Sequence, residues 1–270
     1  MIKRLVSILG AMSASILMAV APADAKPKAE KASELVVKAA DTVAYFANDS
    51  AFEPLWDTAD NAKAMVIIPR SLRGGFMLGA SGGNAVMIAR NDDGSWSEPT
   101  FFTIGSISFG FQAGVEGSET ILLVMTQRGV EHLLSTTVKL GADLSIAAGP
   151  IGAGAKAQTV DVLAFSRSRG LYGGISLEGA ILKSRGSWNR DYYQANVSPS
   201  DIIFREKVSQ PQSAVLQNAV WALAHRDQPA LMAPVQPKRI DPVTGDPLPE
   251  KPVYEDDAIY GAPLAPIEGN

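Results

Sequence analysis

The sequence has no cysteine and only two histidines among its 270 residues. Disulfides and thiolate metal sites are therefore excluded, and the stability of the protein must come from a buried apolar core. The net charge of −4 also lacks the basic excess that is typical of proteins that bind nucleic acids. We therefore expect no nucleic-acid partner, no metal and no other cofactor.

Long hydrophobic runs are scarce as well, and the clearest one, Leu5–Val20, lies at the start of the chain. Lys3 and Arg4 precede this run and small residues around Ala25 follow it, which is typical of a secretory signal peptide. An uncleaved anchor is the less favoured alternative, because polar residues interrupt the run and it is shorter than the ~20 residues that a spanning helix needs. We predict a signal peptide over residues 1–25, with cleavage near Ala25, and a periplasmic or secreted mature protein.

Glycines recur inside alternating aliphatic segments, at residues 74–83, 109–117, 141–152 and 170–179. The alternation predicts β-strands, which glycine normally weakens. Repeated glycines in strands indicate bends, bulges or places where a ligand or another backbone approaches closely. The sequence therefore predicts a strongly curved sheet that is poor in side chains suited to catalysis.

Apolar residues at spacings of three and four predict an amphipathic helix over residues 33–48, with Ser33 as its N-cap. The other predicted helices are 52–60, 127–136 and Ala214–His225. The predicted strands are 64–69, 75–81 and 84–90, with a hairpin turn at Gly82-Gly83, and then 142–148, 158–165 and 171–183.

These elements predict an α+β fold in which a curved, mostly antiparallel or barrel-like sheet packs against an N-terminal amphipathic helix and one or two further helices. The predicted domain spans residues 26–206 and is followed by a short helical extension over 207–228. Residues 229–270 are rich in proline and are predicted to form a disordered tail.

Six segments resemble, in this order, the SYLF domain family of lipid-binding proteins: AKAMVIIP, GGFMLGASGGNAVMIARNDDGSWSEP, FQAGVEGSETILLVM, LGADLSIAAGPIG, SRSRGLYGGISLEGAIL and NRDYY. The resemblance covers roughly residues 30 to 200. It implies an exported lipid-binding protein in the bacterial branch, whereas eukaryotic members bind phosphoinositides through an N-terminal amphipathic helix and some bind actin. We do not extend actin binding or phosphoinositide specificity to an exported protein.

The same resemblance implies that the membrane-binding element corresponds to Leu35, Val36, Val43 and Phe46. From the residues alone, this apolar stripe has two interpretations that stay open. It can pack on the sheet as ordinary core, or it can insert into a lipid interface.

Basic residues flank the predicted strands, and arginine suits phosphate because its planar fork donates two hydrogen bonds at once. If they converge, these side chains form a headgroup site, and if they do not, they are solvated charges at strand ends. The set is Lys63, Arg70, Arg73, Arg90, Arg167 and Arg169.

The predicted function is noncatalytic lipid or membrane binding in the cell envelope, with apolar helix residues on acyl chains and arginines on phosphate. The first alternative is an envelope protein-interaction or scaffolding module that uses the proline-rich tail and the WNRDYY segment (188–193) as contact surfaces. A second alternative, a hydrolase, would use Glu116 or Glu178 as its carboxylates. We predict that the protein is not an enzyme.

Overall fold

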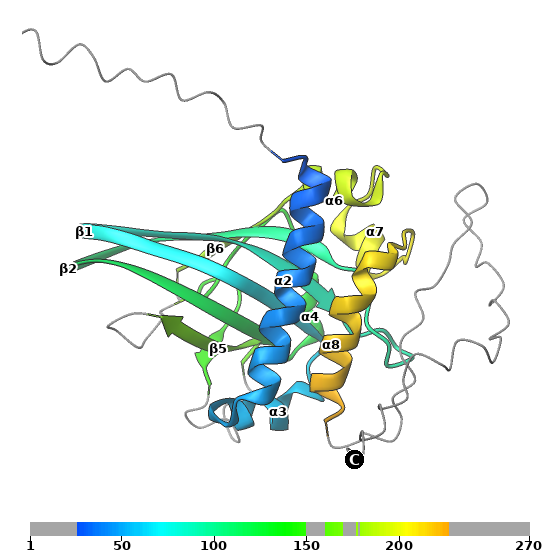
Figure 1. The fold of residues 1–270 in the computed structure, drawn as a ribbon, viewed down its shortest axis with the longest axis horizontal. Coiled ribbons are helices and arrows are strands. Elements are labelled where there is room, and N and C mark those ends of the chain that lie inside the picture. Colours follow the sequence, from blue (N-terminus) through cyan, green and yellow to red (C-terminus); the bar gives the residue numbers. More distant parts are fainter. Residues whose placement is uncertain (1–25, 150–159, 170–176, 178, 227–270) are drawn as a thin grey trace, which may run out of the picture.

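The computed structural model describes residues 26–149, 160–169, 177 and 179–226 (Figure 1). A curved, mostly antiparallel sheet carries helices on both faces, which confirms the α+β fold class. The predicted signal peptide, the proline-rich tail and Glu178 lie outside the described residues. Within the described part, each helix is too short or too polar to cross a membrane.

The N-terminal helix α2 (Lys28–Asn48) follows the predicted apolar periodicity, but it begins earlier than predicted. Its N-cap is Pro27, and Ser33 lies inside the helix with its hydroxyl donating to the Ala29 carbonyl at 3.1 Å. The prediction of Ser33 as N-cap is therefore wrong, because the first turn carries polar residues that the apolar pattern does not reveal. A 3-10 turn, η2 (Ser50–Phe52), follows, and then helix α3 (Glu53–Ala59), which matches the predicted helix over 52–60.

Strand β1 (Ala64–Ala89) extends away from the helices and then folds back, so that its two halves run in opposite directions. The residues just outside its two ends are neighbours, because the Arg90 N–H donates to the Lys63 carbonyl at 2.8 Å. Near its middle, between Gly75 and Met77, the register with its partner strand shifts. The two halves of β1 therefore form the centre of an arm that projects beyond the helices (Figure 1).

The hairpin turn predicted at Gly82-Gly83 is wrong, since both glycines lie inside β1 and pair with Gly105 and Ile104. A glycine pair is a strong local turn signal, but here long-range pairing decides the backbone path. A Cβ built on Gly83 would lie 2.5 Å from the Arg70 carbonyl oxygen, so close backbone approach is the reason for glycine at this position.

Strand β2 (Thr100–Val124) flanks β1 on both sides, because its two ends pair with opposite ends of β1. The outer edge of β2 pairs with β6 (Ile181–Ser184) near its start and with β5 (Val162–Arg169) near its end. The short strands β3 (Thr137–Lys139) and β4 (Ile146–Ala148) pair with β6 and β5, and only the β4–β5 pair is parallel among the described strand pairs.

Parts of the predicted strands 142–148, 158–165 and 171–183 are not strand in the described residues, since β4, β5 and β6 are shorter or shifted. Helix α4 (Gln127–Leu133) matches the predicted helix over 127–136. The WNRDYY segment lies in a helix, α6 (Gly186–Tyr193), whose Trp188 and Tyr192 are buried in the core. These rings are therefore not the contact surface that the scaffolding alternative predicted.

Alternation along the strands produces a core on each face of the sheet. The first core contains Met65 and Ile67 together with residues of α2, α3, α6 and α8 (Ala214–Ala224). The second core contains Val66 and Ile68 and is covered by α4 and α7 (Pro199–Ile203). Because α8 shares the first core with α2, the predicted helical extension packs directly onto the domain.

Candidate functional site

The predicted acyl-chain residues of α2 lie in the first core. Val36, Val43 and Phe46 are fully buried, and Leu35 is 8% exposed. Of the two interpretations that the sequence left open, the structure displays the core-packing arrangement. Lipid contact by these four side chains would require α2 to leave the sheet.

The solvent-facing side of α2 is fixed to the sheet by an aromatic and ionic contact. The guanidinium of Arg167, on β5, lies over the ring of Tyr45 at 3.4 Å from its centroid. Arg167 also forms an ion pair with Glu119 on β2, and the Tyr45 hydroxyl donates to the Asp49 carboxylate at 2.8 Å. Arg167 is thus a structural contact of α2 in this conformation rather than a free phosphate ligand.

The other predicted basic residues do not gather at one place. Lys63 lies exposed at the base of β1, next to Arg90, whose guanidinium stacks on Trp96 at 5.1 Å. Arg70 is exposed farther along β1 and Arg73 is half-buried. Burial lowers the pKa of Arg90 below its ordinary value, although Asp60 partly opposes the shift.

Strand register separates two more of the predicted arginines. Arg73 lies opposite Glu116 and Arg169 lies opposite the next residue, Gly117. Successive residues of a strand face opposite sides of a sheet, so these two positions do not share a face. The side chains of Arg169 and Glu116 lie outside the described part, as does all of Glu178.

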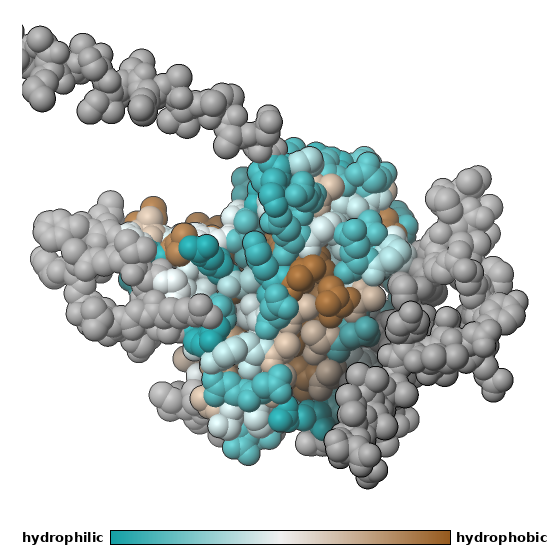
Figure 2. Space-filling model, viewed as in Figure 1, coloured by the Kyte–Doolittle hydropathy of each residue, from teal (hydrophilic) through white to brown (hydrophobic). Residues whose placement is uncertain are grey.

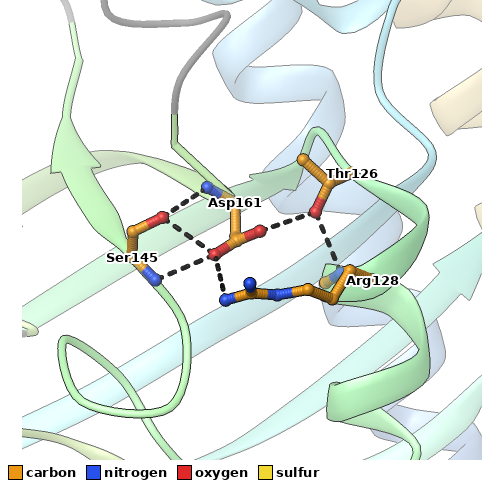
Figure 3. A network of polar contacts seen from close by, with 5 residues as sticks. Thr126, Arg128, Ser145 and Asp161 are labelled. Atoms are coloured by element: carbon orange, nitrogen blue, oxygen red, sulfur yellow. Dashed lines mark hydrogen bonds and ion pairs between the residues drawn. The ribbon is translucent and has the colours of Figure 1, made fainter.

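A polar network that the sequence did not reveal centres on Asp161, just before β5 (Figure 3). Its carboxylate accepts from the hydroxyls of Thr126 and Ser145, each at 2.8 Å, and contacts the Arg128 guanidinium at 3.4 Å. Burial alone would raise the pKa of Asp161. The hydrogen bonds from Thr126 and from the hydroxyl and N–H of Ser145, together with the charge of Arg128, outweigh burial and hold the pKa below its usual range. The network joins the start of α4 to the β4–β5 region.

This network has no catalytic arrangement among its contacts. The Ser145 hydroxyl donates to the Asp161 carboxylate and accepts from the Asp161 N–H at 2.8 Å. Both hydrogen bonds hold the start of β4 against the start of β5. No histidine takes part in the contacts of Figure 3, and a serine nucleophile needs a base beside it. In the described ranges no three His, Cys, Asp or Glu residues are grouped as a metal ion would require.

A second carboxylate, the half-buried Glu98, links the segment between β1 and β2 to the C-terminal helices. It accepts from the Ser213 hydroxyl at 2.5 Å, the Gln210 N–H at 3.1 Å and the Tyr193 hydroxyl at 3.4 Å. Burial raises the pKa of Glu98, although these hydrogen bonds partly oppose the shift. The contact partners come from separate segments, so local sequence carries no signal for this cluster.

Strand register aligns three glycines with two exposed apolar residues across the arm. Ile181 of β6 lies opposite Gly105 of β2, which lies opposite Gly82 of β1. On the other half of β1, Leu72 lies opposite Gly117. The glycine row, as we name it, consists of Ile181, Gly105, Gly82, Leu72 and Gly117.

The neighbours of Gly83 show how the two halves of β1 are aligned with each other. A Cβ built on Gly83 would lie 3.2 Å from the Cα of Ser71, so these two residues are side by side. The halves are antiparallel, and Leu72 is therefore beside Gly82. The row is continuous from β6 to the far half of β2.

The glycine row lies on the sheet face that carries α2. Residues opposite each other across strands point to the same side, and sides alternate along a strand. Phe101 and Ile121 pack in the first core with α2, and Gly105 and Gly117 follow them at even spacing along β2. Ile107, also at even spacing, shares this face.

The described residues do not cover the middle of the row. A Cβ on Gly82 or Gly105 would have its nearest neighbours at 3.7 and 3.6 Å, and both are carbonyl oxygens of the adjacent strand. Those distances are ordinary contacts, so packing within the described part does not demand glycine at either position. Among the described residues no further backbone approaches these two glycines, so close approach stays a prediction there.

Three large apolar side chains on this face are exposed to solvent. Ile107 is 74% exposed, and Leu72 and Ile181 are each 45% exposed. Figure 2 shows apolar surface on the projecting arm as well as on the α2–α8 side, where Val37 is 49% exposed. Exposed apolar groups gathered on one face are typical of an interaction site.

Residues 105–222 match the Ysc84 family, described as Las17-binding protein actin regulator. This part of the chain is a Ysc84, or SYLF, domain. The match confirms the family that the sequence resembles, and it extends past residue 206 into α8.

Several curated proteins are similar to the chain. An SH3 domain-containing protein of Schizosaccharomyces pombe is 27% identical over 249 residues, which cover 87% of this chain and 53% of the relative. The human SH3 domain-containing YSC84-like protein 1 is 34% identical over 149 residues, 53% of this chain and 43% of the relative. LAS seventeen-binding protein 3 of Saccharomyces cerevisiae is 30% identical over 190 residues, 67% of this chain and 41% of the relative.

The chain therefore spans about half the length of the curated relatives it matches, or somewhat less. The names of these relatives describe SH3-containing proteins and a Las17-binding protein, and none of them names an enzyme. No solved structure matches the chain.

Proposed function

We propose that this protein is a noncatalytic interaction domain that binds a partner protein through the arm formed by β1 and β2. The observation that carries the proposal is the exposure of Leu72, Ile107 and Ile181 on one sheet face. The Ysc84 description and the yeast relative named for binding Las17 support the same class of function. Their own partners are not transferred to this chain.

The strands of the arm offer a matched test, because Ser81 and Ser106 lie on the opposite face and contact each other at 2.7 Å. A photo-crosslinking amino acid is placed at Ile107 or Ile181, and at Ser81 or Ser106 as the control, in cells that make the protein. We expect the first two positions to yield a discrete crosslinked protein that the control positions do not yield. Equal crosslinking from both faces, or none from Ile107 and Ile181, would contradict the proposal.

Lipid binding is the second candidate, and the exposure of Arg70 two residues from Leu72 favours it. An apolar side chain beside a cation suits an anionic lipid interface. Co-sedimentation with vesicles of phosphatidylglycerol and phosphatidylcholine tests this function. If lipid is the ligand, Leu72→Asp and Ile107→Asp abolish vesicle binding, whereas Val37→Asp on α2 leaves it unchanged.

The cell envelope remains the proposed location, and the sequence of residues 1–25 supports it. Edman sequencing of the protein from the periplasmic or culture-medium fraction tests this location. We expect a mature N-terminus near Lys26. An intact N-terminus in the cytosolic fraction would contradict export.

A further inference from the structure

We propose that the glycine row is a docking site for an acidic amphipathic helix of a partner protein, which lies next to α2 on the same sheet face with its axis along the strands. This inference rests on the proposed interaction function and names the chemistry of its partner. Four observations carry it: the apolar flanks, the width between them, the height of α2 and the charge around the row.

The first two observations concern shape. Ile181 and Leu72 are three strand spacings apart, which corresponds to about 14 Å at ~4.8 Å per spacing. An α-helix with its side chains is about 10–12 Å across. Gly105 and Gly82 form the floor between the flanks, and without side chains they let a helix approach the sheet closely. Ile107, farther out on the same face, offers a next apolar contact.

The third observation distinguishes a helix from a membrane surface. Helix α2 covers the neighbouring part of the same sheet face and, through Tyr45 and Arg167, reaches β5 (Figure 1). A packed helix rises about 10 Å above a sheet. A flat bilayer that touches α2 therefore does not reach the floor at Gly82, whereas a single helix fits beside α2.

The fourth observation is charge. Lys139 lies opposite Ile181 across the β3–β6 pair, Lys183 follows Ile181 on the same side of β6, and Arg70 precedes Leu72. All three cations are exposed. A cationic rim around an apolar floor complements an acidic helix with one apolar stripe.

Acidic groups near the row are already engaged. Glu119 forms an ion pair with Arg167, and Asp143 accepts the Lys139 N–H at 2.7 Å. On α2, the Glu34 carboxylate pairs with Lys26 and Lys38. The ion pairs offset the charges of Glu119 and Glu34. Asp143 keeps its negative charge, because its donor is a neutral backbone N–H, so among these residues three rim cations stand against one uncompensated acid.

The test uses the full mature chain and two fluorescent peptides of about five helical turns (~18 residues). Both carry leucine at helical spacing, one with glutamate and the other with lysine at the remaining positions. Fluorescence anisotropy should show binding of the glutamate peptide at least tenfold tighter than binding of the lysine peptide, with the difference reduced in high salt. Equal affinities, or no binding of the glutamate peptide, would overturn the inference.

Variants locate the site. The double variant Gly82→Val with Gly105→Val fills the floor and should weaken binding of the glutamate peptide at least tenfold. The control, Ser81→Val with Ser106→Val, fills the opposite face of the same strands and should leave the affinity for this peptide unchanged. Lys139→Glu with Lys183→Glu should weaken it about tenfold. A large loss of thermal stability in the glycine double variant would show that another segment of the chain already occupies the floor, and would refute the site.

Two further outcomes separate this inference from the proposed function. If the glutamate peptide fails to bind but crosslinks from Ile107 persist, the interaction function stands and the acidic helix is refuted. If phosphatidylglycerol vesicles bind with the same dependence on Gly82 and Gly105, the row belongs to a membrane contact instead.

Discussion

The guanidinium carbon of Arg167 lies 3.4 Å from the centre of the Tyr45 ring, and this contact joins α2 to β5 at the root of the arm. Arg167 is also paired with Glu119, so one side chain connects the helix with two neighbouring strands. The apolar side of α2 packs in the first core, and the Tyr45–Arg167 contact holds its polar side. The first prediction concerns the strength of this link.

We expect Tyr45→Leu to lower the free energy of unfolding by about 0.5–1 kcal/mol, because it removes the face of the ring beneath a partly desolvated cation. Denaturant unfolding of Tyr45→Leu, Arg167→Met and the double variant measures the coupling between the two side chains. A coupling of about 0.5 kcal/mol or more supports a direct contact, whereas strictly additive effects would refute it.

Phe46→Ala should destabilise the protein by about 3–5 kcal/mol, since the ring is fully buried and its removal leaves a cavity. Val37→Ala, on the exposed side of the same helix, should change stability by less than about 0.5 kcal/mol. Urea unfolding compares the two variants. A neutral Phe46→Ala would show that the apolar stripe of α2 is not part of the core in solution.

Two adjacent glycines should respond differently to alanine. Gly83→Ala forces a methyl group to 2.5 Å from the Arg70 carbonyl oxygen and should cost roughly 1–3 kcal/mol. Gly82→Ala meets only ordinary contacts and should be neutral or stabilise by up to about 1 kcal/mol, because it reduces the entropy of the unfolded chain. Thermal unfolding ranks both variants against the wild type, and a reversed order would contradict the pairing inside β1.

Glu98 should make stability fall as pH rises. Burial raises the pKa of Glu98 above its ordinary 4.5, so the native protein holds a proton that the unfolded chain releases. The stability that this proton provides is fully present below the pKa of Glu98 in the unfolded chain. It is lost as the pH rises through the pKa of Glu98 in the native protein. Other carboxyl groups act in the opposite direction, because hydrogen bonds lower the pKa of Asp161.

The measurement is therefore a difference between two proteins. The amide side chain of the Glu98→Gln variant cannot titrate. The free energy of unfolding of this variant minus that of the wild type should therefore increase as pH rises above about 4.5, because only the wild type loses stability. Urea unfolding at a series of pH values gives this difference. A difference that is independent of pH would show that Glu98 has an ordinary pKa in the native protein.

Local periodicity was sufficient to predict the helices that pack by an apolar stripe. Helices α2, α4 and α8 lie close to their predicted ranges, because spacings of three and four are encoded within each segment. Helix α6 was missed because its aromatic residues favour strands in isolation. Its burial of Trp188 and Tyr192 is decided by the core of the folded protein.

The site depended on register, which sequence spacing does not encode. Glycine repeats correctly indicated close backbone approach at Gly83, but they did not reveal that Gly82 and Gly105 align between Ile181 and Leu72. The sequence grouped the basic residues by charge alone. Their distribution over both ends of β1 and over β5 follows from long-range strand pairing.

The enclosure of β1 between the two ends of β2 also sets an order of assembly. The halves of β1 meet after closing a short loop, whereas Ala64 must find Val124 across the whole of both strands. Pairings that are distant along the chain form slowly, because loop-closure entropy is lost before their contacts are gained. Refolding should therefore begin within β1 and end when the last part of β2 closes around it, which exposes the unpaired edge of β1 to aggregation until that step is complete.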